Sequence, residues 1–276
     1  MRRLAACLLA LLLWPLTLPA QEPLWEAGLG AGALRYPHYR GSDQSETLFF
    51  PIPYVVYRGE ILRFDRDGLR SLLFTSDRIE LDLSLDGVFP VNDDNNARAG
   101  MDNLSPILEM GPSINVLLWQ EQDRLRSLSL RLPLRAAISV DSGPRFDHQG
   151  WSFAPNLYWV DNAAGFSGQW RRTASIGPVF ADSRYHDYFY TVRARDEIPG
   201  ERPQFDASGG YSGARLSLAS SRRLGPIWVG AFGRYERLDG ARIRNSPLVE
   251  RDDAWLVGAG ISWVFAESER QVPRRD

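Results

Sequence analysis

Hydrophobic and polar residues alternate along most of this chain. The clearest example is residues 79–86, and a period of two predicts a β-strand with one apolar and one polar face. The two faces hold Ile79, Leu81, Leu83 and Leu85 against Glu80, Asp82, Ser84 and Asp86. A soluble sandwich turns the apolar face inward, whereas a transmembrane barrel turns it toward lipid. One strand does not decide between them.

The same alternation recurs and predicts twelve strands in all. They cover about residues 25–33, 47–57, 62–65, 69–74, 79–86, 108–118, 128–138, 151–161, 168–182, 211–221, 227–237 and 254–265. In the last strand, alternate residues from Trp255 to Phe265 form a wholly apolar face with three aromatic rings. Such rings are typical of the aromatic girdle at a membrane interface.

The connections between these strands differ in length according to the side on which they lie. One side has short turns at 58–59, 76–77, 120–123, 162–167 and 224–225. The other has long loops at 37–46, 90–103, 139–149, 183–209 and 239–252, with 66–68 as the exception. Residues 185–190 also fit a strand, but a thirteenth strand would break the even number of a bacterial barrel. The sequence therefore predicts an all-β fold, a transmembrane antiparallel β-barrel of about 12 strands with short periplasmic turns and long extracellular loops.

The two ends of the chain are predicted to lie outside the barrel. Residues 1–20 have a basic start, an apolar run from Leu4 to Leu13, and a small residue, Ala20, at the expected cleavage point. This layout predicts a signal peptide rather than a buried helix, and Cys7 lies too early in the run for a lipoprotein site. The barrel domain is expected over 21–265, and the polar tail 266–276 is expected to lie free in the periplasm.

Composition agrees with a location in the bacterial outer membrane. The chain holds 9 Trp, 10 Tyr and 13 Phe, and aromatic rings concentrate at membrane interfaces. The formal net charge of −2 is close to neutral, which excludes the basic field of a nucleic-acid binder. Cys7 is the only cysteine, so the mature chain is expected to have no disulfide.

Few residues suggest catalysis. The histidines, His38, His148 and His186, all fall in predicted outer loops. An esterase would pair His148 or His186 with a serine such as Ser152 or Ser183, but no third orienting group is evident. Residues 92–96, rich in Asn and Asp, offer oxygens to calcium but lack the Gly and closing Glu of a dedicated loop, which favours a solvated turn. We therefore expect no enzyme activity, no cofactor and no metal site.

Charged residues are predicted on the lumen side of several strands. A pore would keep positive and negative side chains apart and so create an electric field across its water-filled lumen. A closed barrel would pair them, because charges buried in a narrow lumen need partners. Twelve strands is a modest size and favours the narrow lumen. The predicted lumen residues are Glu80, Asp82, Asp86, Glu109, Arg126, Arg131, Arg135, Arg171 and Arg215.

Several motifs resemble the MipA/OmpV family. The first follows the first strand as Tyr36-Pro37-x-Tyr39-x-Gly41-Ser42-Asp43, and Pro51-x-Pro53-Tyr54 lies in the second strand. The later ones are Tyr185-x-x-Tyr188-Phe189-Tyr190-x-Val192, the segment from Arg202-Pro203 to Tyr211-Ser212-Gly213, Ser246-Pro247-Leu248-Val249, and Gly258-x-Gly260-Ile261-Ser262-Trp263-Val264-Phe265. The resemblance spans the mature chain, and the motif rich in Tyr, Arg, Pro and Gly is expected to pack over the lumen.

The resemblance implies a non-enzymatic outer-membrane barrel surrounded by outer-membrane lipid. The family's name-giving member binds a lytic murein transglycosylase and is thought to scaffold it with a murein synthase, so both enzymes are the implied partners. A pore or uptake channel for small solutes is the alternative, and an adhesin or a lipid hydrolase is less favoured. The motifs themselves do not select among these roles.

Overall fold

The structure is a computed structural model that describes residues 21–59, 62–65, 68–71, 74–76, 78–88, 95–140, 146–164 and 170–273. The expected signal peptide and residues 92–94 of the polar loop lie outside this range. Its elements are β1 (Gln21–Pro23), β2 (Trp25–Pro37), β3 (Ser45–Arg58), β4 (Leu62–Asp65), β5 (Gly68–Ser71), β6 (Phe74–Thr75), β7 (Ile79–Val88), η2 (Asn96–Arg98), β8 (Ile107–Gln120), β9 (Arg126–Val140), β10 (Phe146–Phe153), β11 (Asn156–Ala164), β12 (Trp170–Ala181), α2 (Ser183–Tyr190), η3 (Ala194–Asp196), β13 (Gly210–Leu224), β14 (Ile227–Arg237), β15 (Asp253–Glu267) and β16 (Gln271–Pro273).

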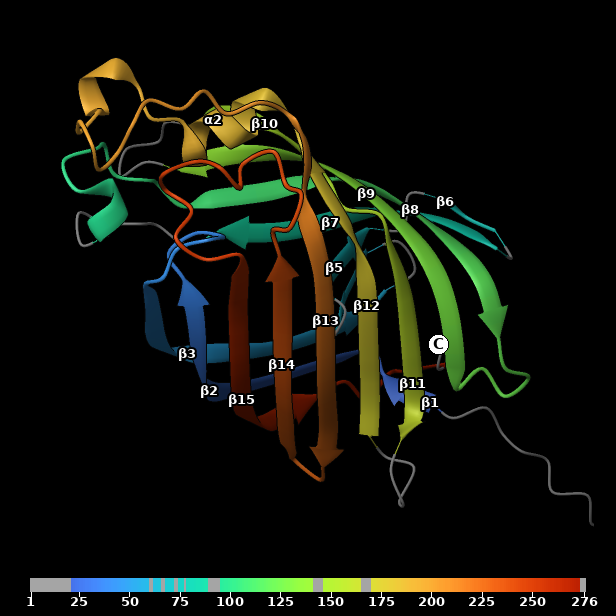
Figure 1. The fold of residues 1–276 in the computed structure, drawn as a ribbon. Coiled ribbons are helices and arrows are strands. Elements are labelled where there is room, and N and C mark those ends of the chain that lie inside the picture. The colour runs from blue at the N-terminus through green and yellow to red at the C-terminus, as the bar shows by residue number, and fades with distance from the viewer. Residues whose placement is uncertain are drawn as a thin grey trace, which may run out of the picture.

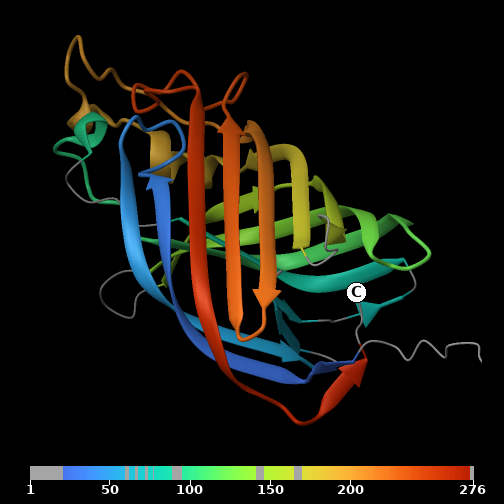
Figure 2. The same cartoon turned by 90° about the horizontal axis from the view of Figure 1, so that it is seen from below.

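One 14-stranded antiparallel sheet forms the wall of a barrel (Figures 1 and 2). The order of the strands runs from β5 through β4, β3, β2 and β15 to β12, and onward through β10, β9, β8 and β7 to β6. The two ends of this order, β5 and β6, are consecutive in the chain and only residues 72–73 separate them. β5 and β6 together correspond to one predicted strand, and β10 and β11 to another, so the fourteen strands occupy the twelve strand positions that the sequence predicts.

The interruption between β10 and β11 has a local cause. Pro155 follows Ala154 at the break, and a proline cannot donate to a ladder. Above the break β10 pairs with the upper part of β9, and below it β11 pairs with Arg126–Arg131 of the same strand. The sequence predicts one continuous strand here, and the structure divides it.

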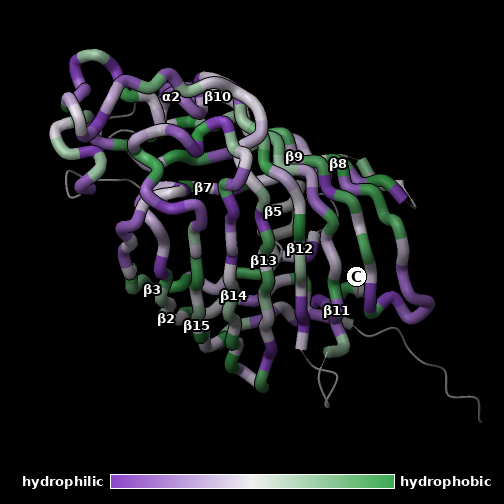
Figure 3. Tube along the Cα trace, in the orientation of Figure 1, coloured by the Kyte–Doolittle hydropathy of each residue, from purple (hydrophilic) through white to green (hydrophobic). Residues whose placement is uncertain are grey.

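Most strands turn an apolar face away from the barrel lumen, and hydropathy alternates along the strands in Figure 3. Leu29, Ile176 and Trp263 are more than half exposed on this outer face, as lipid-facing residues of a barrel are expected to be. The lumen side holds buried polar groups such as Asp82 of β7 and Ser262 of β15. Among the described residues, the helices are too short to span a membrane.

The two chain ends meet in a small ribbon. β1 pairs with β16 antiparallel, with Glu22 opposite Val272, as a separate two-stranded sheet. Arg58 fixes this ribbon to the barrel, because its guanidinium lies 2.8 Å from Glu22 and donates to the carbonyl oxygen of Pro23. The C-terminal segment therefore does not lie free as predicted: β15 extends to Glu267, and residues 271–273 are paired.

Candidate functional site

The long connections at one end of the barrel fold into a compact cap. It consists of segments 38–44, 95–106, 182–209 and 238–252, together with the adjacent strand ends. Its core includes the buried side chains Tyr39, Leu104, Ile107, Tyr185, Phe189, Tyr190, Val192, Leu238, Ile243 and Leu248. Loops that the sequence presents as long extracellular connections therefore carry a hydrophobic core of their own.

Helix α2 lies at the centre of the cap (Figure 1). The side chain of Asp182 accepts a hydrogen bond from the backbone N–H of Tyr185 at 2.8 Å and so caps the first turn. The buried residues of α2 repeat at a spacing of three to four positions, which places them on one helical face. They are Tyr185, His186, Phe189 and Tyr190. The sequence predicts a loop over residues 183–209, and the structure instead has a short helix there, followed by a largely irregular chain.

Hydrogen bonds join cap segments that lie far apart in the sequence. Tyr39 donates to the carbonyl oxygen of Leu248 at 2.8 Å, and Tyr190 donates to that of Arg40 at 3.0 Å. Burial raises the pKa of Tyr190 to about 12, so its hydroxyl stays protonated and able to donate. Arg202, which is 7% exposed, donates to the carbonyl oxygens of Asp196, Ala97 and Ala99 at 2.9–3.0 Å. The motif rich in Tyr, Arg, Pro and Gly therefore packs over the lumen, as predicted.

The three histidines take different places. His38 and His186 are buried in the cap, whereas His148 lies in β10, within a strand rather than a loop. Of the serines suggested as partners, Ser152 donates to Glu109 at 2.6 Å. His186 instead meets Ser212, which no pattern in the sequence marks as its partner; the Ser212 hydroxyl lies 2.8 Å from Nε2 of His186.

The pair of His186 and Ser212 is buried and structural. Nδ1 of His186 lies 2.7 Å from the carbonyl oxygen of Ser208, which only accepts, so Nδ1 carries the proton and Nε2 accepts from Ser212. Arg40 donates to the same hydroxyl at 2.6 Å. Burial lowers the pKa of His186 to about 4, and both side chains are fully buried. No carboxylate orients this histidine, and the hydroxyl has no exposed face for a substrate.

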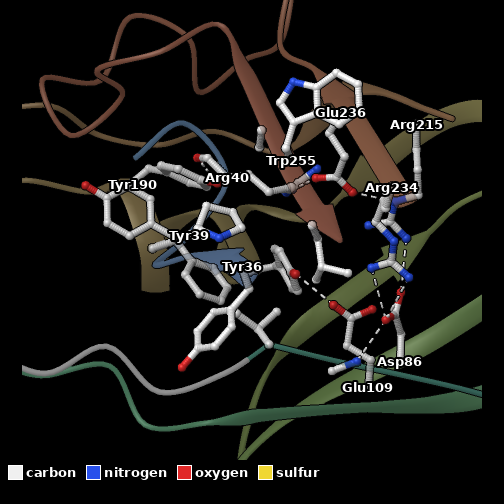
Figure 4. A pocket seen from close by; sticks show the side chains of 17 residues that line it. Tyr36, Tyr39, Arg40, Asp86, Glu109, Tyr190, Arg215, Arg234, Glu236 and Trp255 are labelled. Atoms are coloured by element: carbon white, nitrogen blue, oxygen red, sulfur yellow. Dashed lines mark hydrogen bonds and ion pairs between the residues drawn. The ribbon is translucent and has the colours of Figure 1, made fainter. Parts of the chain in front are cut away.

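Beneath the cap, arginines and carboxylates form one connected network across the lumen (Figure 4). Asp86 of β7 lies 3.0 Å from Arg215, 3.3 Å from Arg234 and 3.7 Å from Arg135. These arginines come from β13, β14 and β9, so one carboxylate ties together strands from different sides of the wall.

Two further carboxylates extend this network to the cap. Glu236 pairs with Arg215 and lies 3.6 Å from Arg40 in the cap segment. Glu109 accepts from the hydroxyls of Tyr185 at 2.7 Å and Ser152 at 2.6 Å. Buried charges of this kind are tolerated because each one has partners. The cap and the lumen network therefore form one continuous polar and apolar seal.

Two cavities flank the network. The upper one, about 70 Å³, lies under the cap and is lined by Tyr36, Tyr39, Tyr190 and Val88 among others. The lower one, about 270 Å³, lies in the lumen proper. Its charged lining residues are Asp82, Asp86, Arg131, Arg135, Arg215 and Arg234. Four arginines and two aspartates line this cavity, and Arg135, Arg215 and Arg234 among them are paired with Asp86.

The nine charged residues predicted for the lumen fall into three groups. Asp86, Glu109, Arg135 and Arg215 belong to the network described above. Four others have the same inward register away from it: Asp82 accepts from Asn115, Arg131 lies over the ring of Tyr158, Arg171 donates to Asn162, and Glu80 lies opposite Asn115.

Arg126 is placed differently from the prediction. It has the same register parity as the outward-facing Leu128, and at the rim it pairs with Asp161 at 3.3 Å and Glu121 at 3.2 Å. The long arginine side chain reaches solvent there, so the outer face tolerates its charge.

Three network residues were missed by the sequence analysis. Arg234 and Glu236 alternate with outward residues in β14, so the same period of two that identified the others also marks them. Arg40 lies in an irregular loop, where no periodicity marks it. Among the described residues, no cluster of three or more His, Cys, Asp or Glu side chains is arranged to hold a metal ion. Asn95, from the loop considered for calcium, is instead buried and donates to Ser42 at 3.0 Å.

This fold and its capped lumen define a β-barrel of the outer-membrane class. The family model described as MltA-interacting protein MipA matches residues 29–265, and the chain belongs to that family. The outer membrane protein Omp26La of Vibrio anguillarum is 25% identical over 250 residues, which is 88% of each chain. The protein YiaT of Escherichia coli (strain K12), whose name also refers to the outer membrane, is 21% identical over 259 residues, covering 92% of this chain and 96% of that one.

A solved structure named "Bacterial polysaccharide outer membrane secretin" covers 87% of this chain and 99% of its own, with 10% identity and a TM-score of 0.44. With the family match, the relatives place this protein in the outer membrane.

Proposed function

We propose that this barrel is non-enzymatic and acts by contact, as a scaffold that holds a lytic murein transglycosylase and a murein synthase at the outer membrane. The observation that carries the proposal is the seal across the lumen. A buried cap and a connected arginine–carboxylate network lie across the path that a solute would follow along the barrel axis. A barrel closed in this way favours binding at its surface over conduction. The name of the family, which refers to interaction with MltA, supports the same role.

The contact surface is the end of the barrel that carries both termini. The turns at this end are short, which identifies it as the periplasmic side in outer-membrane barrels. The β1–β16 ribbon lies there. Arg58 contacts β1, whereas the order of this small sheet leaves the outer edge of β16 without a described partner strand. A sheet edge can bind an extended segment of another protein by strand addition. The ribbon therefore supplies binding surface that the short turns lack.

A binding titration tests this role directly. Purified full-length protein, immobilised in detergent, is titrated with a purified lytic murein transglycosylase, and saturable binding is expected. Val272→Pro removes a backbone donor from β16 and should weaken the binding, whereas Arg195→Ala at the exposed surface of the cap should leave it unchanged. The same preparation should show no steady conductance in planar bilayers. If the protein shows steady conductance and does not bind the murein enzyme, the scaffold role is wrong and the protein is a channel.

A further inference from the structure

The barrel wall is short between β3 and β7. Along β3, the described partner on the side away from β2 is β4, which pairs only with Tyr57 and Arg58. Along β7, β6 pairs only with Glu80 and Leu81. Within the described part of the chain, the cap-side lengths of both strands, 45–56 and 82–88, therefore have no strand partner on the sides that face one another. A closed barrel normally has no such edges.

The sequence and exposure of β3 agree with an open edge. Pro51 and Pro53 cannot donate to a ladder, and prolines within sheets are confined to edges. Tyr54 and Val56 point into the barrel and are buried at 7% and 3% exposure. Leu48 and Phe50 share this inward register but are 39% and 36% exposed. The inner face of β3 thus becomes accessible where the neighbouring strands end.

The exposed inner face continues as an apolar wall across four strands. The register aligns Phe232 of β14 with Gly258 of β15, Leu34 of β2 and Leu48 of β3 in one row. The side chain of Ile52 lies close over Gly32 and Gly260 and fills the space that those glycines leave. Phe232 is 43% exposed although its register points it into the lumen. Such apolar surface is unfavourable against water alone.

The polar part of the lumen adjoins this apolar wall, and more arginines than carboxylates line its lower cavity. Arg131, Arg135, Arg215 and Arg234 line the lower cavity against two aspartates. Arg234 follows Phe232 by two residues on the same face of β14, so the charged and apolar surfaces adjoin. Arg131 carries a buried Nε without a hydrogen-bond partner. The lumen therefore has an apolar surface that could bind a hydrocarbon chain next to arginines that could bind an anion. The gap in the wall between β3 and β7 gives access to both surfaces.

We propose that the gap between β3 and β7 is a lateral entrance for a single-chain anionic amphiphile. Its hydrocarbon chain lies on the apolar inner wall of β3, β2, β15 and β14, and its acidic head group binds Arg131, whose buried Nε has no hydrogen-bond partner among the described residues. No bond is made or broken, so the site binds and does not catalyse. The cap lies above this entrance, because Asn96 donates to Gln44 at 2.6 Å and joins the segment after β7 to the loop before β3.

Native mass spectrometry of the full-length protein with dodecanoate tests the proposal. One dodecanoate per chain should bind saturably, while dodecyltrimethylammonium and inorganic phosphate should not. Phe50→Asn, which removes apolar contact area, and Arg131→Gln, which removes the head-group charge, should each weaken the binding by about tenfold or more. The matched control is Thr173→Asn, because Thr173 points into the lumen from β12 on the other wall. It should bind as the wild type does.

Three results would overturn the assignment. Equal binding of the cationic amphiphile would remove the role of the arginines, and unchanged binding by Phe50→Asn would remove the apolar wall. Competition by inorganic phosphate alone would show that the site binds any anion and has no role for the hydrocarbon chain.

A second measurement does not depend on whether the Phe50→Asn variant folds. Leu48→Cys introduces a thiol into a chain whose only natural cysteine lies in the expected leader, and dodecanoate should slow its reaction with a water-soluble maleimide. An unchanged rate contradicts the proposal.

Discussion

Arg202 is the side chain through which the stability of the cap is most directly tested. Its guanidinium donates to carbonyl oxygens of two cap segments, Ala97 and Ala99 in one and Asp196 in the other, and it is nearly buried. Arg202→Ala removes all three hydrogen bonds and leaves buried acceptors behind. Hydrogen bonds from a charged donor contribute about 1.5–3 kcal/mol each and are not additive. The free energy of cap opening should therefore fall by roughly 3–5 kcal/mol.

Hydrogen exchange of the backbone amides in α2 measures this change. Because each 1.4 kcal/mol is about a tenfold change in an equilibrium constant, the open population should rise about 100-fold or more. The matched control is Arg195→Ala in the same connection. Arg195 lies 2.6 Å from Asp102, but both side chains are exposed at 63% and 85%. An exposed ion pair of this kind contributes about 0–1 kcal/mol.

The comparison between the two arginine variants decides the interpretation. Heat-modifiable migration on gels should be the same for both, since the barrel strands are untouched. If α2 in Arg202→Ala exchanges no faster than in Arg195→Ala, then the cap does not depend on this buried guanidinium. The account of the cap as a cooperatively packed seal would then be wrong.

Three other perturbations test other parts of the molecule. Asp86→Asn leaves lumen arginines without their shared carboxylate and should cost about 3–5 kcal/mol in barrel unfolding, while Asp102→Asn at the exposed pair should change stability by less than about 1 kcal/mol. His186 has a folded pKa of about 4 against a reference value of 6.5, so the unfolded cap binds the proton first. Cap stability should fall as the pH decreases from 6.5 toward 4, by up to about 1.4 kcal/mol per pH unit, and should be constant above pH 6.5. Hydrogen exchange of the cap amides measures this pH dependence, and the His186→Gln variant should lack it. Leu130→Arg on the lipid face should lower the free energy of barrel unfolding by roughly 2–4 kcal/mol if the residue lies near the membrane midplane. Heat-modifiable migration on gels should then be weaker for Leu130→Arg than for the control Leu130→Ala.

The wall of the barrel was predictable because each strand carries its own evidence. Alternation marks the inward face locally, so Asp86, Arg135 and Arg215 could be assigned to the lumen without any knowledge of their partners. The same rule applied to β14 would also have found Arg234 and Glu236. It could not show that Asp86 meets arginines from three different strands, because that depends on how the sheet curves.

The cap was not predictable by the same reasoning. Its contacts join residues as far apart as Tyr39 and Leu248, and its segments have no repeating pattern of apolar positions. The aromatic residues of α2 alternate too irregularly to distinguish a short helix from a strand, and only the even number of strands in a bacterial barrel argues against a strand there. The buried hydrogen bond from the Ser212 hydroxyl to Nε2 of His186 depends on this tertiary arrangement as well.

The two proposals depend on opposite ends of the barrel, and this makes them separable. The cap and the network close the axis, so a molecule that reaches the lumen of the described structure from the cap side enters through the short wall between β3 and β7. Contact with murein enzymes, in contrast, depends on the ribbon that holds Val272 near the termini. Phe50→Asn should therefore impair amphiphile binding and leave enzyme binding intact, and Val272→Pro should do the reverse. If both variants lose both activities, the two activities do not depend on separate ends of the barrel, and the assignment of each to its own surface would be wrong.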